Sequence, residues 1–230
     1  MASELLQHGA RVALTARRPI PLEDIAGHYP QARALPMDAT DPLAWQSAHE
    51  LLLEDWGAID LVVFCAAQYR QERSWELRAV RVHDTIEVNL ASIYYGLEVI
   101  LPDMITSGAG SVVLIASVAG YMGLPNATVY GPTKAAIINL AELLYAELHP
   151  KGLGVYLVNP GFVKTTMTAN NSFNMPAIVS ADTAASEIIQ GIAQGRFEIH
   201  FPKRFTRLLK IVSMLPYRSR LAILMRIIGS

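Results

Sequence analysis

Cysteine is nearly absent from this 230-residue chain, in which Cys65 is the only one. A single cysteine excludes an internal disulfide framework and a multi-cysteine zinc site, and we expect no metal. No uninterrupted apolar run approaches the roughly 20 residues that cross a bilayer. The first eight residues also lack the cationic and apolar stretches of a secretory signal. These absences favour a cytoplasmic protein that does not span a membrane.

Net charge is also small, because 19 Lys and Arg balance 20 Asp and Glu and leave −1. The balance hides an uneven distribution. Residues 201–230 contain no acid and seven basic residues, which are Lys203, Arg204, Arg207, Lys210, Arg218, Arg220 and Arg226. With 52% hydrophobic residues, the chain has ample material for one core, which excludes a disordered chain. We therefore expect a domain over residues 1–200 that continues into a basic, amphipathic, helical extension over residues 201–230.

Short apolar runs alternate with longer segments of helical period. The expected strands are Arg11–Thr15, Arg33–Met37, Ile59–Cys65, Ser111–Ala116, Gly154–Val158 and Arg196–His200. The expected helices between them are Pro21–Gly27, Pro42–Asp55, Ser74–Thr106, Val129–His149 and Ala181–Gln194. This alternation predicts a doubly wound, Rossmann-like α/β fold, with a mostly parallel sheet between two helical layers. The runs Leu61–Phe64 and Val112–Ile115 are apolar at every position, as in strands buried on both faces.

The start of the chain lacks a feature that such a fold normally has. A doubly wound nucleotide-binding domain opens with a strand, a glycine-rich turn and a helix whose N-terminus faces phosphate. Here residues 2–7 already have a helical pattern, His8-Gly9 forms a cap, and no G-x-G-x-x-G occurs nearby. We expect the first strand and this turn to be missing, because of a late start assignment or a truncated form.

The motif with the clearest chemical meaning is Tyr130-Gly131-Pro132-Thr133-Lys134, which follows Ser117 by 13 residues. Residues four apart share a helix face, so Lys134 is expected beside the Tyr130 phenol, where its charge would lower the tyrosine pKa. Tyrosine would then serve as an acid or base near neutral pH. Ser117, at a strand end, could hydrogen-bond a carbonyl oxygen. Tyr-x-x-x-Lys alone occurs by chance in many helices, and it is the joint spacing with Ser117 that favours a site.

These residues resemble the short-chain dehydrogenases/reductases, and the matches run in order over nearly the whole chain. Asp38, in Met37-Asp38-Ala39-Thr40-Asp41, matches the adenine-ring segment. Phe64-Cys65-Ala66-Ala67 occupies the place of the Asn-Asn-Ala-Gly segment that lines the cofactor. Asn89, Ser117, Tyr130 and Lys134 match the four active-site residues, and Pro160, Gly161 and Thr165 match the Pro-Gly-x-x-x-Thr segment at the nicotinamide end.

The resemblance implies hydride transfer to or from a nicotinamide cofactor. Tyr130 would be the acid/base, Ser117 would polarise the substrate oxygen, and Lys134 would bind the nicotinamide ribose. Asn89 would hold a relay water, although it could equally stabilise a kink in its helix. Thr15-Ala16-Arg17-Arg18 contains no acid after its strand, so NADP(H) is preferred over NAD(H), with Arg17 at the 2′-phosphate and Arg18 near adenine. Solvated surface arginines are the alternative.

Two departures from the family affect the cofactor site. Ala66 and Ala67 keep small side chains in the cofactor-lining segment, but its asparagines are absent. The missing first strand would lie between the strands Arg11–Thr15 and Ile59–Cys65, so these neighbours should leave a gap or pair differently. Without the glycine-rich turn, we expect weak or no NADPH binding by the 230-residue form. A non-catalytic or cofactor-impaired scaffold is therefore the alternative to a carbonyl reductase.

Substrate and partners are less well defined by the sequence. Residues 166–179 occupy the place of the substrate lid, and a small to medium hydrophobic substrate is suggested by Met167, Phe173, Met175, Tyr121, Met122 and Leu124. The resemblance implies a homo-dimer or homo-tetramer built through residues 74–106 and 129–149. The tail either packs on the domain or on another subunit, which we favour, or makes a peripheral membrane contact. Nucleic acid is not expected as a partner.

Overall fold

The structure is a computed structural model that describes residues 1–169 and 175–229. Its strands are β1 Val12–Ala16, β2 Ala32–Pro36, β3 Leu61–Phe64, β4 Ser111–Ile115, β5 Gly154–Pro160 and β6 Glu198–Phe201. Its α-helices are α1 Ala2–Gln7, α2 Ile20–Ala26, α3 Pro42–Trp56, α4 Ala79–Ile86, α5 Ser92–Ser107, α6 Tyr130–Leu148, α7 Ala181–Ala193, α8 Lys203–Met214 and α9 Tyr217–Gly229. Most lie within one or two residues of the expected bounds, which is the ordinary uncertainty of helix and strand ends.

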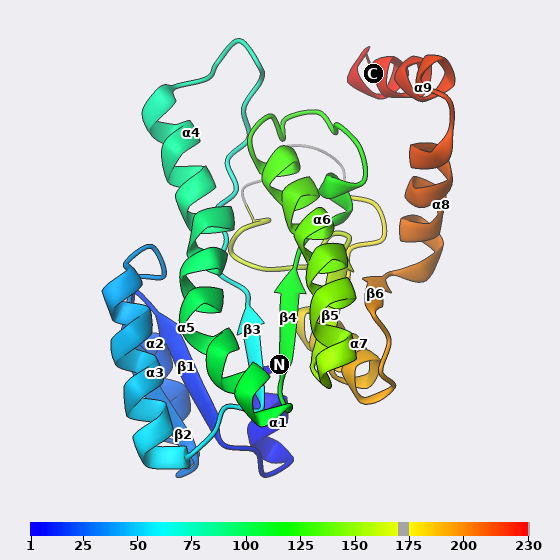
Figure 1. Cartoon of the computed structure of the whole chain (residues 1–230). Coiled ribbons are helices and arrows are strands. Elements are labelled where there is room, and N and C mark those ends of the chain that lie inside the picture. The colour runs from blue at the N-terminus through cyan, green and yellow to red at the C-terminus, as the bar shows by residue number, and fades with distance from the viewer. Residues whose placement is uncertain (170–174, 230) are drawn as a thin grey trace.

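All strand pairs are parallel, but they form two sheets rather than one. β1 pairs with β2, and β3, β4, β5 and β6 pair in that order. β1 and β3 are therefore not paired with each other, and Figure 1 shows the β1–β2 ribbon standing apart from β3. Of the two outcomes expected from the sequence, a gap or a new pairing, the structure has the gap.

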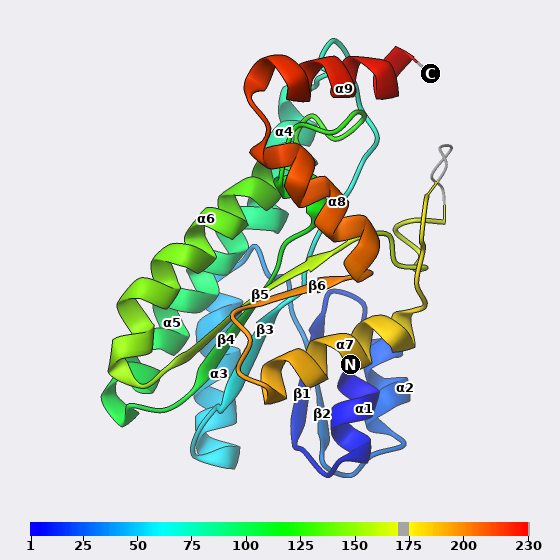
Figure 2. The same ribbon diagram turned by 90° about the vertical axis from the view of Figure 1, so that its right-hand side faces the viewer.

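Helices cover both faces, as expected for a three-layer α/β/α fold. Figure 2 shows α3, α5 and α6 on one side of the strands and α1, α2 and α7 on the other. The larger core cluster joins β3, β4 and β5 to α5 and α6, with Val112 and Leu114 fully buried. A second cluster joins Val158 and Ile199 to α7.

The expectation that Leu61–Phe64 is buried on both faces is met in part, because Leu61, Val62 and Val63 pack against the two core clusters but are only partly buried. Only Phe64 is buried in β3, whereas Val112, Val113 and Leu114 of β4 are all fully buried. The physical reason is the sheet order, because β3 is an edge strand and β4 lies between two partners.

The helix expected over residues 74–106 begins five residues later than expected and contains one irregular turn. α4 begins at Ala79, a π-helical turn, η1, covers Glu87–Ala91, and α5 then runs to Ser107. The widened turn contains Asn89. Side chains cap two other helices: Asp41, before α3, accepts a hydrogen bond from the backbone N–H of Leu43, and Ser180, before α7, accepts one from that of Thr183.

The basic tail is helical, as expected. α8 follows β6 directly, and residues 215 and 216 separate it from α9. In Figure 1 the tail extends past the ends of the strands, toward the end of the molecule where α4 begins. No helix in the described ranges is long and apolar enough to cross a bilayer.

Candidate active site

The predicted site residues gather where the parallel strands end. Ser117 follows β4 and caps the 3₁₀ turn η2 (Val118–Gly120), while Tyr130 is the first residue of α6. Cys65, Ala66 and Ala67 follow β3, and Pro160 and Gly161 end β5. Because the carboxyl ends of parallel strands share one edge, these segments lie on the same side of the sheet.

Ser117 and Tyr130 lie side by side. Burial raises the pKa of the Tyr130 phenol to about 12, and a hydrogen bond with the Ser117 side chain opposes part of that rise. The Ser117 hydroxyl oxygen also accepts a hydrogen bond of 3.1 Å from the backbone N–H of Ala119. The phenol is therefore protonated at neutral pH in this structure and could donate a proton to a nearby oxygen.

Lys134 is almost completely buried, with 2% of its surface exposed, one turn after Tyr130. Its Nζ donates a 2.7 Å hydrogen bond to the carbonyl oxygen of Ile115, and lies 5.5 Å from the centroid of the Tyr130 ring. Burial lowers the lysine pKa to about 8. The predicted lowering of the Tyr130 pKa by Lys134 is not met here, since the ammonium faces a backbone carbonyl and is itself desolvated.

Asn89 joins three segments. Its side-chain amide accepts from the backbone N–H of Gln68 at 2.6 Å, donates to the carbonyl of Gln68 at 2.9 Å, and donates to Thr133 Oγ1 at 3.2 Å. The residue is fully buried within the π-helical turn. It thus connects the segment after β3 to α6 across a distorted helix, which supports the expected role in a kink. The relay role remains a prediction.

Sequence reasoning missed Tyr69. Its ring meets that of Tyr130 edge to face, with centroids 5.0 Å apart, and its hydroxyl donates to the carbonyl of Asn126 at 3.4 Å. Burial raises the Tyr69 pKa. The sequence could have indicated Tyr69 by its position, because it lies two residues after Ala67 in the segment that follows β3 and leads into the site.

A second missed feature is a polar cluster around Glu198. Its Oε1 accepts hydrogen bonds from Tyr121 at 2.9 Å and from Asn159 Nδ2 at 2.8 Å, and its Oε2 pairs with Lys210 of α8. Burial raises the Tyr121 pKa, and the neighbouring carboxylate raises it further. Asn159 is fully buried and its Oδ1 has no hydrogen-bond partner in the described part of the chain. The cluster ties the turn after Ser117 and the end of β5 to the tail.

The predicted adenine-end residues lie on the two-stranded sheet. Arg17 and Arg18 are exposed just after β1, and Asp38 is exposed just after β2. The Asp38 carboxylate accepts from the backbone N–H and hydroxyl of Thr40, and these hydrogen bonds, with a smaller contribution from Arg17, lower its pKa. Arg17 and Asp38 are therefore neighbours, as an adenosine-binding role for both requires.

The predicted nicotinamide-end residues lie on the other sheet. The backbone N–H of Gly161 donates to the carbonyl of Phe201 at 2.7 Å, and a Cβ at this glycine would lie 3.1 Å from the Phe205 ring. Thr165 is exposed, as is Ala66, while Pro160 and Ala67 are half-buried. Pro160 ends β5 and Gly161 follows it, at the same edge of the sheet as Ser117 and Tyr130.

The described residues offer fewer contacts for the pyrophosphate in the middle of a dinucleotide cofactor. No glycine-rich turn joins the adenine-end and nicotinamide-end residues within the described ranges. Gly9, which follows α1, precedes β1 and so lies at the opposite edge of that strand. The two ends of the cofactor fit the residues present, whereas its pyrophosphate does not. Within the same ranges, no group of three His, Cys, Asp or Glu side chains could hold a metal ion.

The predicted substrate wall is partly in place. Met122 is buried, Leu124 is half-buried and Met167 is exposed. Met175 lies at the start of the next described segment, and Phe173 lies outside the described residues. The Tyr121 hydroxyl is already bound to Glu198, so only its ring is open to an apolar contact.

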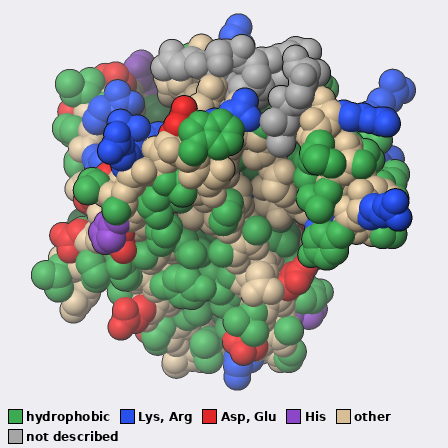
Figure 3. Space-filling view, turned by 90° about the horizontal axis from the view of Figure 1, so that it is seen from above, with side chains coloured by type: hydrophobic (Ala, Val, Ile, Leu, Met, Phe, Trp, Pro, Cys, Tyr) green, Lys and Arg blue, Asp and Glu red, His purple; other side chains and the backbone are tan. Residues whose placement is uncertain are grey.

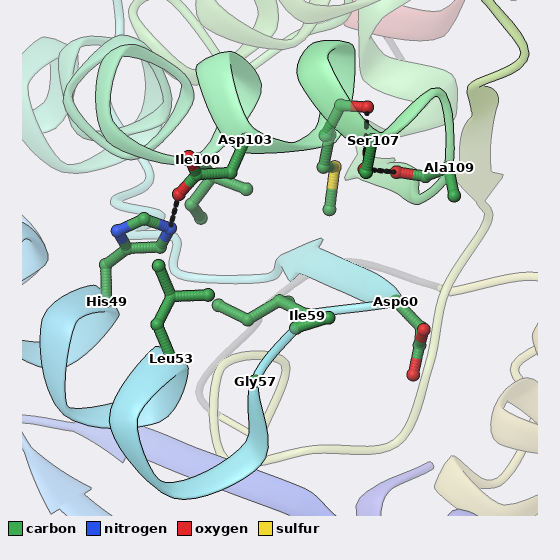
Figure 4. A pocket seen from close by; sticks show the side chains of 11 residues that line it. His49, Leu53, Gly57, Ile59, Asp60, Ile100, Asp103, Ser107 and Ala109 are labelled. Atoms are coloured by element: carbon green, nitrogen blue, oxygen red, sulfur yellow. Dashed lines mark hydrogen bonds and ion pairs between the residues drawn. The ribbon is translucent and has the colours of Figure 1, made fainter.

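A separate hollow lies at the opposite edge of the sheet. Figure 4 shows it between α3 and α5, with His49 Nε2 lying 3.1 Å from Asp103 Oδ2. Its walls include residues 57–60 and 107–109, which immediately precede β3 and β4. It therefore faces the amino ends of the strands, away from Ser117 and Tyr130.

Comparison with known proteins gives consistent matches. The family model for short chain dehydrogenase matches residues 1–175. A protein of Myxococcus xanthus (strain DK1622) named "Uncharacterized oxidoreductase" is 29% identical over 220 residues, covering 94% of this chain and 87% of that protein.

Two solved structures share the fold. A short-chain dehydrogenase from Streptomyces avermitilis has a TM-score of 0.82 at 23% identity, covering 98% of this chain and 91% of that one. A short-chain dehydrogenase from Sphingobium yanoikuyae in complex with NADPH has a TM-score of 0.80 at 22% identity, covering 94% and 91%.

Proposed function

The chain belongs to the short chain dehydrogenase family, and from that premise we propose that it transfers hydride between NADP(H) and the carbonyl or alcohol group of a small to medium hydrophobic substrate. The observation that carries the proposal is the pairing of Ser117 with Tyr130 over the buried Lys134. When bound, the nicotinamide supplies the hydride, and the chain supplies orientation and the proton.

The side chains divide the work of carbonyl reduction. Tyr130, whose raised pKa keeps it protonated, donates its phenolic proton to the carbonyl oxygen. The Ser117 hydroxyl donates a hydrogen bond to the same oxygen and polarises it. Lys134 would bind the nicotinamide ribose hydroxyls, and its positive charge would stabilise the phenolate that forms once Tyr130 has given up its proton. Asn89 positions the segment around Gln68 and holds the water of the proton relay.

The adenine end supports a preference for NADP(H) over NAD(H). Two arginines and no acid follow β1, and Arg17 lies close enough to Asp38 to lower its pKa. Arginine accommodates a 2′-phosphate, whereas an acid would hydrogen-bond the ribose 2′-hydroxyl. Arg17 is assigned to the phosphate and Arg18 and Asp38 to the adenine. Ala66 and Ala67 are assigned to the segment that lines the cofactor, and Thr165 to the nicotinamide end.

A second function has its own supporting observation. The separation of β1 from β3, together with the lack of a glycine-rich turn in the described ranges, leaves no site for the pyrophosphate. The alternative is accordingly a cofactor-impaired protein that keeps the fold as a binding scaffold.

Substituting Tyr130 tests the proposed chemistry. In a form of the protein that turns over NADPH with apolar ketones or aldehydes, Tyr130→Phe should lower kcat by about 10²- to 10⁴-fold. Its thermal unfolding should be almost unchanged, because only one hydroxyl is lost. Tyr29→Phe, at a partly buried position between α2 and β2, is the matched control. Full activity in Tyr130→Phe would contradict the assigned mechanism.

Calorimetry separates the two functions for the 230-residue chain. We expect this form to bind NADPH weakly or not at all, and micromolar binding would overturn that expectation. Undetectable binding combined with high-affinity capture of an apolar ketone would favour the scaffold.

Assembly and location complete the proposal. An apolar hollow between α5 and α6 includes the exposed residues Tyr94, Ile105 and Leu143. We assign this face to a homo-dimer or homo-tetramer, and the protein to the cytoplasm. Leu143→Arg should reduce the mass seen by light scattering to that of the monomer.

A further inference from the structure

The tail exposes large apolar side chains along one line of each helix. In α8 the exposed apolar positions are Leu208, Ile211 and Met214, and in α9 they are Tyr217, Leu221 and Met225. The spacing of three or four residues places each set on one helix face. Met214 is 76% exposed and Tyr217 is 72% exposed, so these are open faces rather than partly covered ones. We call these six residues the tail face.

Other residues of the same helices hold the tail to the domain. Thr206 is fully buried and Leu224 is 7% exposed. The ring of Phe205 lies 5.8 Å from that of Phe162, and Lys210 pairs with Glu198. Packing on the domain, which we favoured from the sequence, thus accounts for these residues. It does not account for the tail face, whose six side chains are each at least half exposed.

Arginines accompany the tail face without any acid. Arg204 and Arg207 are exposed on the same side of α8, and Arg218 and Arg226 are exposed beside the apolar line of α9. Residues 201–230 contain no Asp or Glu, so no carboxylate within the tail balances these charges. Figure 3 shows Lys and Arg side chains next to hydrophobic ones at the right-hand edge of the molecule, where the tail lies.

We propose that the tail face docks on the surface of a membrane that contains anionic phospholipid. Exposed apolar side chains would enter the boundary between headgroups and acyl chains, and the flanking arginines would pair with lipid phosphates. The positive charges beside the tail face favour an anionic membrane over a neutral apolar partner. A neutral apolar partner leaves four arginines unused, whereas an anionic bilayer uses both the apolar line and the charges.

Docking also orients the candidate site. α8 begins beside the end of β5, where Phe205 lies against Gly161, and Figures 1 and 2 show α9 beyond the carboxyl ends of the strands. The site therefore opens at the end of the molecule that meets the lipid, so its substrate would be an apolar carbonyl compound dissolved in the bilayer. This orientation rests on the proposed function, but the membrane contact does not.

Vesicle co-sedimentation of the full chain tests the docking. Phosphatidylcholine vesicles are compared with vesicles in which about a third of the lipid is phosphatidylglycerol. The wild-type chain should pellet with the anionic vesicles, and added salt should weaken this binding. Equal pelleting with both vesicle types, or none with either, would overturn the proposal.

Two double variants separate the apolar and charged parts. Leu208→Ser with Leu221→Ser, and Arg207→Glu with Arg218→Glu, should each lower anionic-vesicle binding by at least about tenfold. The matched controls are Leu43→Ser, at an exposed position of α3, and Arg196→Glu, at an exposed position before β6, which should bind as the wild type does. Circular dichroism checks that each variant is folded.

The variants also distinguish the other occupants of the tail face. Tail variants that pellet like the wild type would overturn the proposal. Tail variants that dissociate an oligomer, seen by light scattering, while vesicle binding is unchanged would assign the tail face to a second copy. NADPH turnover plays no part in these measurements, so failure of the proposed reaction would leave their outcome unaffected.

Discussion

Lys134 donates its hydrogen bond to the carbonyl oxygen of Ile115 and not to the phenol of Tyr130, although the two side chains are one helical turn apart. The lysine therefore anchors the start of α6 to the end of β4. Its ammonium is held at the cost of nearly complete burial, which brings its pKa from 10.5 to about 8. Because this group titrates so close to neutral pH, the free energy of unfolding should depend on pH.

This pH dependence gives a first prediction. Between pH 8 and about 10 the unfolded chain keeps the Lys134 proton while the folded chain has lost it, so the free energy of unfolding should rise with pH, by about 2 kcal/mol at most. Lys134→Met should flatten this rise, and Lys151→Met, at an exposed site, should preserve it. Urea denaturation across this pH range measures the difference. Parallel curves for the wild type and Lys134→Met would contradict the assigned pKa.

Asn89 gives a second prediction. Asn89→Ala removes three hydrogen bonds and leaves the backbone N–H and carbonyl of Gln68 without their partner, so unfolding should become easier by about 2–4 kcal/mol. Asn139→Ala, at an exposed position of α6, is the matched control. Thermal and urea unfolding measure both variants. A loss below about 0.5 kcal/mol would show that the clamp contributes little.

Glu198 gives a third prediction. Burial alone would raise its pKa, but hydrogen bonds from Lys210, Asn159 and Tyr121 more than offset that effect and lower it. A carboxylate with a lowered folded pKa contributes stability above its unfolded pKa, and that stability is lost as the pH falls through the folded value. Acid unfolding of the wild type should therefore include a component below about pH 4.

Glu198→Gln should lack that component. It should also be less stable at pH 7 by about 1–3 kcal/mol, because the pair with Lys210 is lost while the amide oxygen can still accept from Asn159 and Tyr121. Glu187→Gln, on α7, serves for comparison, because Glu187 makes no such hydrogen bond or ion pair in the described part of the chain. If both glutamine variants unfold in acid as the wild type does, the assigned role of Glu198 is wrong.

Arg17 gives a fourth prediction, at the adenine end. The probes are 2′,5′-ADP and 5′-AMP, which differ in the 2′-phosphate and do not need the middle of the cofactor site. The wild-type chain should bind 2′,5′-ADP more tightly, and Arg17→Gln should reduce that preference by about tenfold. Arg11→Gln is the control, because Arg11 precedes β1 and so lies at the opposite end of that strand from Arg17. An unchanged preference in Arg17→Gln would move the phosphate contact elsewhere.

Local patterns in the sequence predicted much of the fold and the position of the site. Ser117 and Tyr130 could be paired because each follows a strand or starts a helix whose apolar period is clear. The break between β1 and β3 could also be predicted from the sequence, because the order of the motifs leaves out the strand that would lie between them.

What the sequence did not predict depends on contacts between distant residues. The π-helical turn owes its form to bonds between Asn89 and Gln68, 21 residues apart, and no period in the sequence encodes them. The partners of Glu198 come from β5, α8 and the turn after Ser117. Lys134 was placed on the correct face, but its choice of Ile115 over Tyr130 is decided by where the β4 backbone lies.

The separation of β1 from β3 leaves two parallel strands with backbone donors and acceptors that no other strand uses among the described residues. Free strand edges of this kind recruit extended peptides by main-chain hydrogen bonding. A segment that entered between β1 and β3 would be paired on both sides and would join the two sheets into one. The edges of β1 and β3 that face this gap are therefore open to main-chain pairing.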